Sequence, residues 1–251
     1  MATLGAAEVI GCDISESGLL TARERAKNVP NIRFMKGSVL ELPFENNSFD
    51  FVCCAGVLHH TTSIAQGLDE LTRILKPGGK LFLLLYGAGG LRWKLITALR
   101  PLAAELGIEC VDAGIKGAEL PANNRKHFLD DLFVPVQSFV KWNDLRQWLE
   151  QRGFVDIERW TAGRYDHEAN PSAQIEDMEK LRRIFADVAQ SKKGGGVSGE
   201  ILAAIGANVA EDFVTQARKL IENSRNTDEI EKIVIGEGNH RVLATRRQTH
   251  V

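Results

Sequence analysis

Short apolar segments alternate with amphipathic segments along the first third of the chain. The β-rich apolar runs that predict strands are residues 8–13, 31–36, 48–55 and 80–86. Between them, residues 16–27 and 63–75 carry apolar side chains at the three- and four-residue spacing of an amphipathic helix. Strands that alternate with helices favour a parallel sheet with helices on both faces.

Local signals mark where these segments begin and end. Ser15 stands directly before the first helix and is expected to cap it. The Lys-Pro-Gly-Gly sequence at 76–79 predicts a turn, because proline cannot continue a helix and glycines permit a reversal of the backbone. Glu70 and Arg73 stand three residues apart on the second helix and are expected to form a structural ion pair.

The pattern changes after Tyr86, where a glycine-rich segment precedes several helices. The sequence predicts helices at 91–106, 127–133, 143–152, 173–190 and 200–223. A loop-rich stretch is expected between the first two, and a flexible glycine-rich connector at 191–196 between the last two. Strands are expected at 154–160 and 241–246.

Composition agrees with a globular α/β protein and narrows the choice of partner. The 251 residues are 44% apolar and 25% charged, which is enough for one α/β domain with an appended subdomain. A formal net charge of −2 gives no electrostatic reason to expect nucleic acid, and no apolar run has the length of a membrane span. The four cysteines show neither metal-ligand nor disulfide-framework spacing, which favours the reducing cytoplasm. Two of them, Cys53 and Cys54, fall in a run that reads as a buried strand.

A set of short motifs at characteristic spacing carries the most specific signal. The motifs are Leu42-Pro43-Phe44, Ser48-Phe49-Asp50, Leu58-His59-His60, Glu70 and the RILKPGG sequence at 73–79. Together they resemble class I S-adenosylmethionine-dependent methyltransferases, of the small-molecule type similar to methyltransferase domain 11. The resemblance is close over residues 4–87 and loose over 142–160 and 240–247.

This resemblance implies an α/β fold with a Rossmann-like parallel sheet and an antiparallel last strand, to which a helical cap and a helical insertion are added. The implied segments are a partial cofactor-binding core (1–87), a substrate cap (88–142), a return to the core (143–165), a helical insertion (166–229) and the last strand with its tail (230–251).

The resemblance also implies that one element is missing. In the family, a strand and a glycine-rich turn grip the methionine end of the cofactor, and an acidic residue follows about twenty positions later. Here that acid is Asp13, and residues 4–7 look like the tail of the helix that follows the turn. We therefore expect a truncated chain whose sheet lacks its first strand, with a partner or self-association as a means of completing it.

Cofactor contacts follow from the resemblance for four residues near the first two strands. Asp13, at the end of a strand, would receive the ribose hydroxyls of S-adenosylmethionine, and Ile14 would face adenine. Ser38 and Val39 would contact adenine, where relatives often have an aspartate, so a neutral hydroxyl predicts weaker selectivity. The alternatives are a helix-capping role for Asp13 and a simple turn at residues 38–39.

Small residues end the next strand and precede a pair of histidines. Cys54, Ala55 and Gly56 stand where the family places the methionine part of the cofactor, and small side chains permit close approach of a ligand. His59 and His60 would then line the space between cofactor and acceptor. Helix capping or exposure to solvent would explain the two histidines equally well.

Methyl transfer from a sulfonium needs an in-line nucleophile more than acid–base machinery, so a base is required only for a poor nucleophile such as a hydroxyl. The candidate bases are His59, His60, His127, Asp130 and Asp131, of which His59 and His127 are favoured as catalytic residues. No cluster of histidines and acids has the spacing of a metal site.

The cap segment offers side chains for an acceptor. Its aromatic residues are Trp93, Phe128, Phe133, Phe139 and Trp142, which would form either an apolar acceptor pocket or the cap's own core. Arg92, Lys94 and Arg100 would attract an anionic acceptor, although a solvated helix face is the favoured explanation.

Three functions are compatible with these features. The first is an S-adenosylmethionine-dependent methyltransferase that acts on a small-molecule acceptor. The second is a non-catalytic methyltransferase-like binding protein. The third, an NAD(P)-dependent oxidoreductase, shares the β–α–β layout and the acid at a strand end, but it does not predict the motifs at 48–50 and 75–79.

Overall fold

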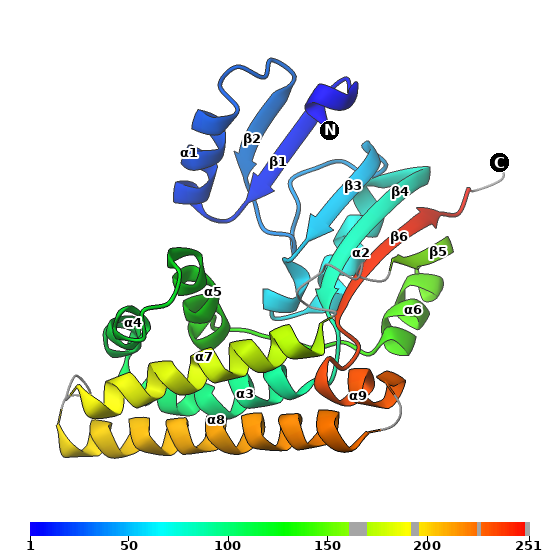
Figure 1. Ribbon diagram of the computed structural model, residues 1–251. Helices are drawn as coiled ribbons and strands as arrows, with labels where there is room; N and C mark the ends of the chain where they lie inside the picture. The colour runs from blue at the N-terminus through cyan, green and yellow to red at the C-terminus, as the bar shows by residue number, and fades with distance from the viewer. Residues whose placement is uncertain (161–169, 192–195, 225–226, 249–251) are drawn as a thin grey trace. The chain divides into compact units, whose positions relative to one another are not determined.

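The computed structural model describes residues 1–160, 170–191, 196–224 and 227–248, which form a mixed α/β protein (Figure 1). The chain divides into two compact units. The first, here called the sheet unit, comprises Met1–Leu83, Arg146–Glu158 and Val242–Val251, and the second, the helical unit, comprises Leu84–Leu145 and Arg159–Arg241. No helix in the described ranges has the length and apolarity needed to cross a membrane.

The strands confirm the Rossmann-like α/β fold and its antiparallel last strand. They are β1 (Val9–Asp13), β2 (Ile32–Lys36), β3 (Phe49–Ala55), β4 (Leu75–Tyr86), β5 (Phe154–Trp160) and β6 (Asn239–Arg246). β1 and β2 pair in parallel as one sheet, and the others form a second sheet in the order β3-β4-β6-β5. β6 runs opposite to β3 and β4 (Figure 1).

A break separates these two sheets. Among the described residues, no strand pairs with the second edge of β1 or of β3. On β3, Val52 and Cys54 are buried while Phe51 and Cys53 are exposed, as the two-residue period of a strand requires when only one face is covered. The prediction that both adjacent cysteines lie in a buried strand is therefore wrong for Cys53.

Two helices of the sheet unit begin at serine caps. Ser15 Oγ accepts a hydrogen bond from the Gly18 amide at the start of α1 (Glu16–Arg25), which confirms the predicted cap. Ser63 does the same for α2 (Ile64–Ile74) through the Gln66 amide. A short 3-10 helix, η2 (Leu58–His60), precedes α2, and α6 (Trp142–Gln151) precedes β5.

The Lys-Pro-Gly-Gly segment differs from the prediction. α2 ends at Ile74 and β4 begins at the next residue, so residues 76–79 form the start of the strand and not a separate turn. Leu75 and Leu81 are both fully buried, and their burial holds the intervening segment against the sheet. Gly78 has a φ of +80°, a conformation that glycine adopts without strain.

Helices dominate the second unit: α3 (Leu91–Leu106), α4 (Ile108–Gly117), α5 (Ala122–Phe133), α7 (Pro171–Gln190), α8 (Val197–Asn223) and α9 (Thr227–Val234). The prediction of a loop-rich stretch after residue 106 is wrong, because α4 and the first residues of α5 occupy it, whereas the predicted helix at 127–133 is confirmed as the rest of α5. Val111, Ile115 and Phe128 are buried there in the core of the helical unit, so packing overrides the weak local pattern. Pro121 only marks the start of α5.

α7 and α8 lie side by side and make the most extensive helix contact of this unit (Figure 1). The buried face of α8 carries small residues: Gly199, Ala203, Gly206, Ala210 and Ala217. A Cβ atom added to Gly206 would lie 2.3 Å from the Phe185 ring, which is itself fully buried. The absence of a side chain at Gly206 therefore sets how closely the two helices approach.

Replacement of Gly206 by alanine should lower the free energy of unfolding by about 1–3 kcal/mol, because Phe185 has no space into which to move. Helix propensity alone predicts the opposite, a gain of about 1 kcal/mol. Urea unfolding of the variant measures the difference. Asn208→Ala, at an exposed position of the same helix, is the control and should change stability by less than about 0.5 kcal/mol. A Gly206→Ala protein as stable as the parent would contradict this account of the packing.

Candidate functional site

Arg73 fixes the loop that follows β2. Its Nε and Nη2 atoms each lie 2.8 Å from an oxygen of Glu70, which confirms the predicted structural pair. Its guanidinium also donates to the carbonyl oxygens of Leu42 and Phe44, at 2.9 and 2.6 Å. Because one arginine binds both a carboxylate and two carbonyls, α2 and this loop are held as one piece.

Ser38 lies inside the segment that this network orders. Its Oγ accepts from the Leu40 amide at 3.2 Å, and the Leu40 carbonyl accepts from the Gln66 side chain at 2.8 Å. Ser38 and Val39 are half-buried and follow β2 after one intervening residue, Gly37. The turn that was the alternative explanation for residues 38–39 is therefore present, near the carboxyl end of a strand.

Asp13 occupies the equivalent place on β1. It stands opposite Lys36 in the parallel ladder, and its carbonyl accepts from the Gly37 amide, so the carboxyl ends of β1 and β2 are adjacent. Oδ1 accepts from the Ser15 amide at 2.8 Å, and no described residue donates to Oδ2. The alternative explanation for Asp13 was that it caps α1. Ser15, two residues later, is the residue that caps this helix. Ile14 is 69% exposed.

The end of β3 combines a buried thiol with an open backbone. Burial raises the pKa of Cys54 to about 12, so its thiol stays protonated and is no nucleophile at neutral pH. Ala55 and Gly56 are exposed. Gly56 has a φ of +76°, and no atom lies within 4 Å of the position that a Cβ would take. A ligand can therefore approach the main chain closely at this point.

His59 is fully buried at the start of the segment that leads to α2. Burial, with a smaller effect of His60, lowers the pKa of His59 to about 3, and the two rings meet edge to face at 4.2 Å. The imidazole is consequently neutral at neutral pH. A group with so low a pKa is a weak general base, because proton transfer is most efficient when the pKa lies near the working pH.

The buried neutral state of His59 makes the free energy of unfolding depend on pH. Between about pH 6.5, its usual pKa, and about 3, the unfolded chain binds a proton that the folded chain does not. The contribution of His59 to the free energy of unfolding is fully present above pH 6.5. It is lost as the pH falls below that value, at up to about 1.4 kcal/mol per pH unit. Urea unfolding at several pH values should show this slope, and His59→Asn should reduce it.

His60→Asn is the matched control for this measurement. Burial of His59 is the larger cause of its lowered pKa, and that burial remains in this variant. It should keep most of the slope. Identical pH dependence in the parent and in His59→Asn would show that His59 is not held neutral by the fold.

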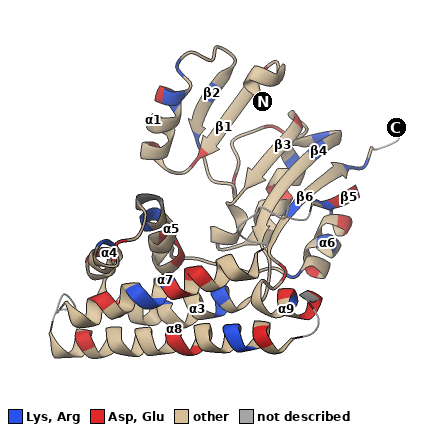
Figure 2. Ribbon diagram, in the orientation of Figure 1, with Lys and Arg blue, Asp and Glu red and all other residues tan. Residues whose placement is uncertain are grey.

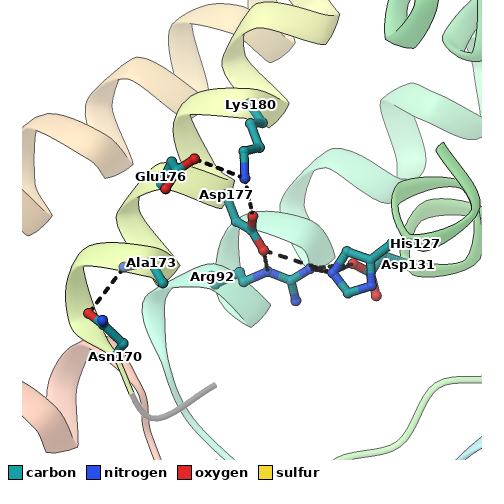
Figure 3. Close-up of polar contacts among 8 residues, drawn as sticks. All are labelled: Arg92, His127, Asp131, Asn170, Ala173, Glu176, Asp177 and Lys180. Carbon is teal, nitrogen blue, oxygen red and sulfur yellow. Dashed lines mark hydrogen bonds and ion pairs between the residues drawn. The ribbon is translucent and has the colours of Figure 1, made fainter. Parts of the chain in front are cut away.

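A second group of polar side chains lies inside the helical unit (Figure 3). Arg92 of α3 is only 4% exposed, and its Nη2 atom lies 2.5 Å from Asp131 Oδ2 of α5. Its Nε atom lies 3.1 Å from Asp177 Oδ2 of α7, whose other oxygen is 3.2 Å from Lys180 Nζ. The expectation that Arg92 lies on a solvated helix face is wrong, because two buried carboxylates compensate its charge.

His127 lies at the border of this group. Half of its side chain is exposed, and Nε2 is 2.7 Å from Arg92 Nη2. The same nitrogen is 3.5 Å from Asp131 Oδ2 and 3.8 Å from Asp177 Oδ2. Of the residues considered as bases, His127 and Asp131 are thus brought together, whereas Asp130 is exposed and outside this set of contacts.

Asp177 and Lys180 were not expected from the sequence. A signal for Asp177 is present, because it shares one face of α7 with the buried residues Leu181, Ile184 and Val188. A carboxylate on an apolar stripe is seldom buried without a partner. The partner is not visible in the sequence, since Arg92 lies 85 positions away.

The five aromatic residues of the cap do not gather into one group. Phe128 is fully buried in the core of the helical unit, as the alternative expected. The rings of Trp93 and Phe139 lie 5.1 Å apart, whereas Trp142 is 5.8 Å from the ring of His240. The cap aromatics therefore serve partly as core and partly as a smaller cluster.

Tyr86 at the end of β4 completes this smaller cluster, here called the aromatic trio (Tyr86, Trp93 and Phe139). Its ring lies 4.6 Å from that of Trp93, and all three residues are half-buried. The guanidinium of Arg92 lies 4.8 Å from the centre of the Trp93 ring, a cation–π distance. Arg92 thus joins the trio to the buried carboxylates and to His127.

Comparison with known proteins places these residues in context. Residues 1–83 match the family described as methyltransferase domain. A demethylmenaquinone methyltransferase of Staphylococcus carnosus is 42% identical over 72 residues, which are 29% of this chain and 30% of that protein. That of Staphylococcus aureus (strain JH9) is 40% identical over 72 residues, with the same coverage. The chain therefore aligns with about 30% of the length of these relatives.

One solved structure supports the fold over nearly the whole chain. A chain in the complex between the Haloferax volcanii Trm112 methyltransferase activator and a methyltransferase aligns with a TM-score of 0.51. It covers 98% of this chain and 75% of that chain at 14% identity, so the likeness concerns the fold alone.

Proposed function

We propose that this chain, whose residues 1–83 match a methyltransferase domain, is a class I S-adenosylmethionine-dependent enzyme that transfers a methyl group to a small-molecule acceptor. One observation carries the proposal: within the matched segment, Asp13 ends a strand, Gly56 follows directly after one, and Ser38 follows another after one intervening residue. Ligands of open α/β sheets bind at the carboxyl ends of strands. The names of the matched relatives, demethylmenaquinone methyltransferases, support a small molecule as acceptor.

Each cofactor contact has a physical basis in this proposal. Asp13 Oδ2 accepts from a ribose hydroxyl, and the exposed Ile14 side chain covers adenine. Ser38 and Val39 contact the adenine edge, while Ala55 and Gly56 leave room for the methionine part. Cys54 and His59 are buried, so we assign them a structural role beside these contacts and no part in the reaction.

Methyl transfer does not require acid–base catalysis by these side chains. The acceptor atom attacks the methyl carbon in line with the carbon–sulfur bond, and S-adenosylhomocysteine leaves as a neutral thioether. Positioning and exclusion of water supply much of the acceleration. We propose a cytoplasmic location as well, in keeping with the cysteine pattern of the sequence.

Calorimetric titration of the full chain with S-adenosylmethionine and S-adenosylhomocysteine tests the proposal. Binding should be detected, and Asp13→Ala should weaken it by about 10- to 100-fold, the effect of a lost hydrogen bond to a charged group. Asp50→Ala is the control, because Asp50 is also an exposed acid of a strand but lies near the amino end of β3, where it pairs with Lys76. It should leave the affinity unchanged.

Absence of any heat of binding at ligand concentrations of about 1 mM would contradict the cofactor assignment. Equal loss of affinity in both variants would contradict the specific role given to Asp13.

The break between the two sheets supports a second candidate function. β1 and β3 each have a second edge that no described strand pairs with, and Phe51 of β3 is 40% exposed. Such edges are templates for pairing with another polypeptide. The chain would then be a methyltransferase-like binding protein that joins a partner, or a second copy, through these strands.

Light scattering during size-exclusion chromatography tests the version with a second copy. The parent should associate as its concentration rises, and Phe51→Lys should be monomeric, because the new charge would be placed in the contact. Ile201→Lys introduces the same charge at an exposed position of α8 and should associate like the parent. A parent protein that stays monomeric at every concentration would contradict self-association.

A further inference from the structure

A buried histidine joins segments of the helical unit that are far apart in the sequence. His240, the second residue of β6, is fully buried. Its Nε2 atom lies 2.7 Å from the carbonyl oxygen of Val140, which also accepts from the Ala88 amide at 2.9 Å. The Val140 carbonyl therefore connects the segment that follows β4, the segment that precedes α6 and the start of β6.

Main-chain contacts hold the same segments at close range. The Val140 amide donates to the carbonyl oxygen of Tyr86 at 3.0 Å. A Cβ atom added to Gly87 would clash with the carbonyl oxygen of Gly238, so only glycine permits this approach. The three segments are here called the His240 junction: residues 86–90, 139–142 and 236–240.

The groups around Nε2 decide where the His240 ring carries its proton. The Val140 carbonyl is an acceptor only. Glu237 Oε2, at 3.4 Å from Nε2, is an acceptor as well, since it already receives the Trp142 amide at 2.6 Å. Nε2 therefore bears a hydrogen, and in the neutral ring Nδ1 bears none. Nδ1 is buried too, and no residue in the described ranges forms a hydrogen bond with it.

A second proton on this ring is unfavourable while the junction is closed. It would enter at Nδ1 and place an unpaired N–H and a charge in the interior. Burial is the largest influence on the pKa of His240 and lowers it, and the Arg159 cation lowers it further. The hydrogen bond to Val140 and the Glu237 carboxylate act in the opposite direction, but the pKa remains below its ordinary value.

The other charged groups of the surrounding elements offer no acceptor to Nδ1. Arg159 of β5 donates to the Glu237 carbonyl at 2.5 Å and lies 5.3 Å from the centre of the Trp142 ring. Arg241, the next residue of β6, is a second cation, and Lys141 is exposed. Figure 2 shows charges of both signs on α9, which precedes β6, and none on the segment between β4 and α3.

We infer that His240 is a pH-sensitive switch, which holds the His240 junction closed while its ring is neutral and opens it when the ring gains a second proton. In the open junction water accepts the hydrogen bond from Nδ1 and solvates the charge. Tyr86 and Phe139 of the aromatic trio belong to the opened segments, so opening also separates their rings from Trp93. This switch is independent of the function proposed above.

The direction of the pH effect follows from the proton uptake of the two states. In the open junction His240 has its ordinary pKa of 6.5, and in the closed junction its pKa is lower. Above pH 6.5 neither state binds the second proton, so the closed form keeps its full advantage. Below that value only the open state binds it, and the open fraction rises by up to about tenfold per pH unit. The rise ends when the pH falls below the lowered pKa.

Hydrogen–deuterium exchange of the full chain, resolved by NMR, tests the switch between about pH 7.5 and about pH 5. The probes are the amides of Ala88, Val140 and Glu237, which all donate inside the junction. After correction for the pH dependence of intrinsic exchange, their protection should fall by up to about tenfold per pH unit below pH 6.5. Amides in the middle of α8 report unfolding of the whole helical unit, and their protection should change much less. Junction protection that is constant over this range, or that falls in step with α8, would overturn the inference.

Two variants identify the histidine responsible. His240→Gln keeps a side-chain N–H for the Val140 carbonyl but has no group that gains a proton, so the junction amides should stay protected at every pH. His59→Asn removes the other buried histidine and should leave the pH dependence of the junction as in the parent. A junction in His240→Gln that opens with the same pH dependence as the parent would overturn the assignment to His240. If His240→Gln does not fold, loss of the pH dependence in His59→Asn would overturn it, and its retention there would support it.

Discussion

Each strand of a parallel sheet needs hydrogen-bonded neighbours, and β1 and β3 have such a neighbour on only one edge in the described part of the chain. The residues proposed to hold the cofactor stand on the strands next to this break, with Asp13 on β1 and Ala55 on β3. The unpaired backbone groups must meet either water or another strand. The proposed cofactor site and the second candidate function therefore involve the same two strands, the first through their carboxyl ends and the second through their unpaired edges.

Two arginines organise the two units in different ways. Arg73 is partly exposed and orders a loop by satisfying carbonyls and one carboxylate, which costs little desolvation. Arg92 is buried, so its charge is tolerated only because Asp131 and Asp177 accept from it. The histidines show a parallel contrast. His59 is kept neutral by burial, whereas His127 is half-exposed and its Nε2 atom lies 2.7 Å from the Arg92 guanidinium.

Much of the sheet unit was predictable from local sequence. The strands and helices up to residue 87 appear at the expected places because apolar periodicity and serine caps act over a few residues. Glu70 and Arg73 were predictable for the same reason, being three positions apart on one helix. α4, the first residues of α5 and α9 were not expected, since their weakly patterned segments become helical through packing against one shared core.

The sequence by itself determined the α/β order of elements, the motifs that resemble methyltransferases, and the position of Asp13, Ser38 and Gly56 at strand ends, all of which depend on neighbours in the chain. Tertiary structure alone decided that Cys53 is exposed, that Arg92 is buried and that His127 meets Asp131 and Asp177. The reason is that burial and charge pairing depend on which distant segments come together, and the 85 positions between Arg92 and Asp177 leave no periodic signal of their contact.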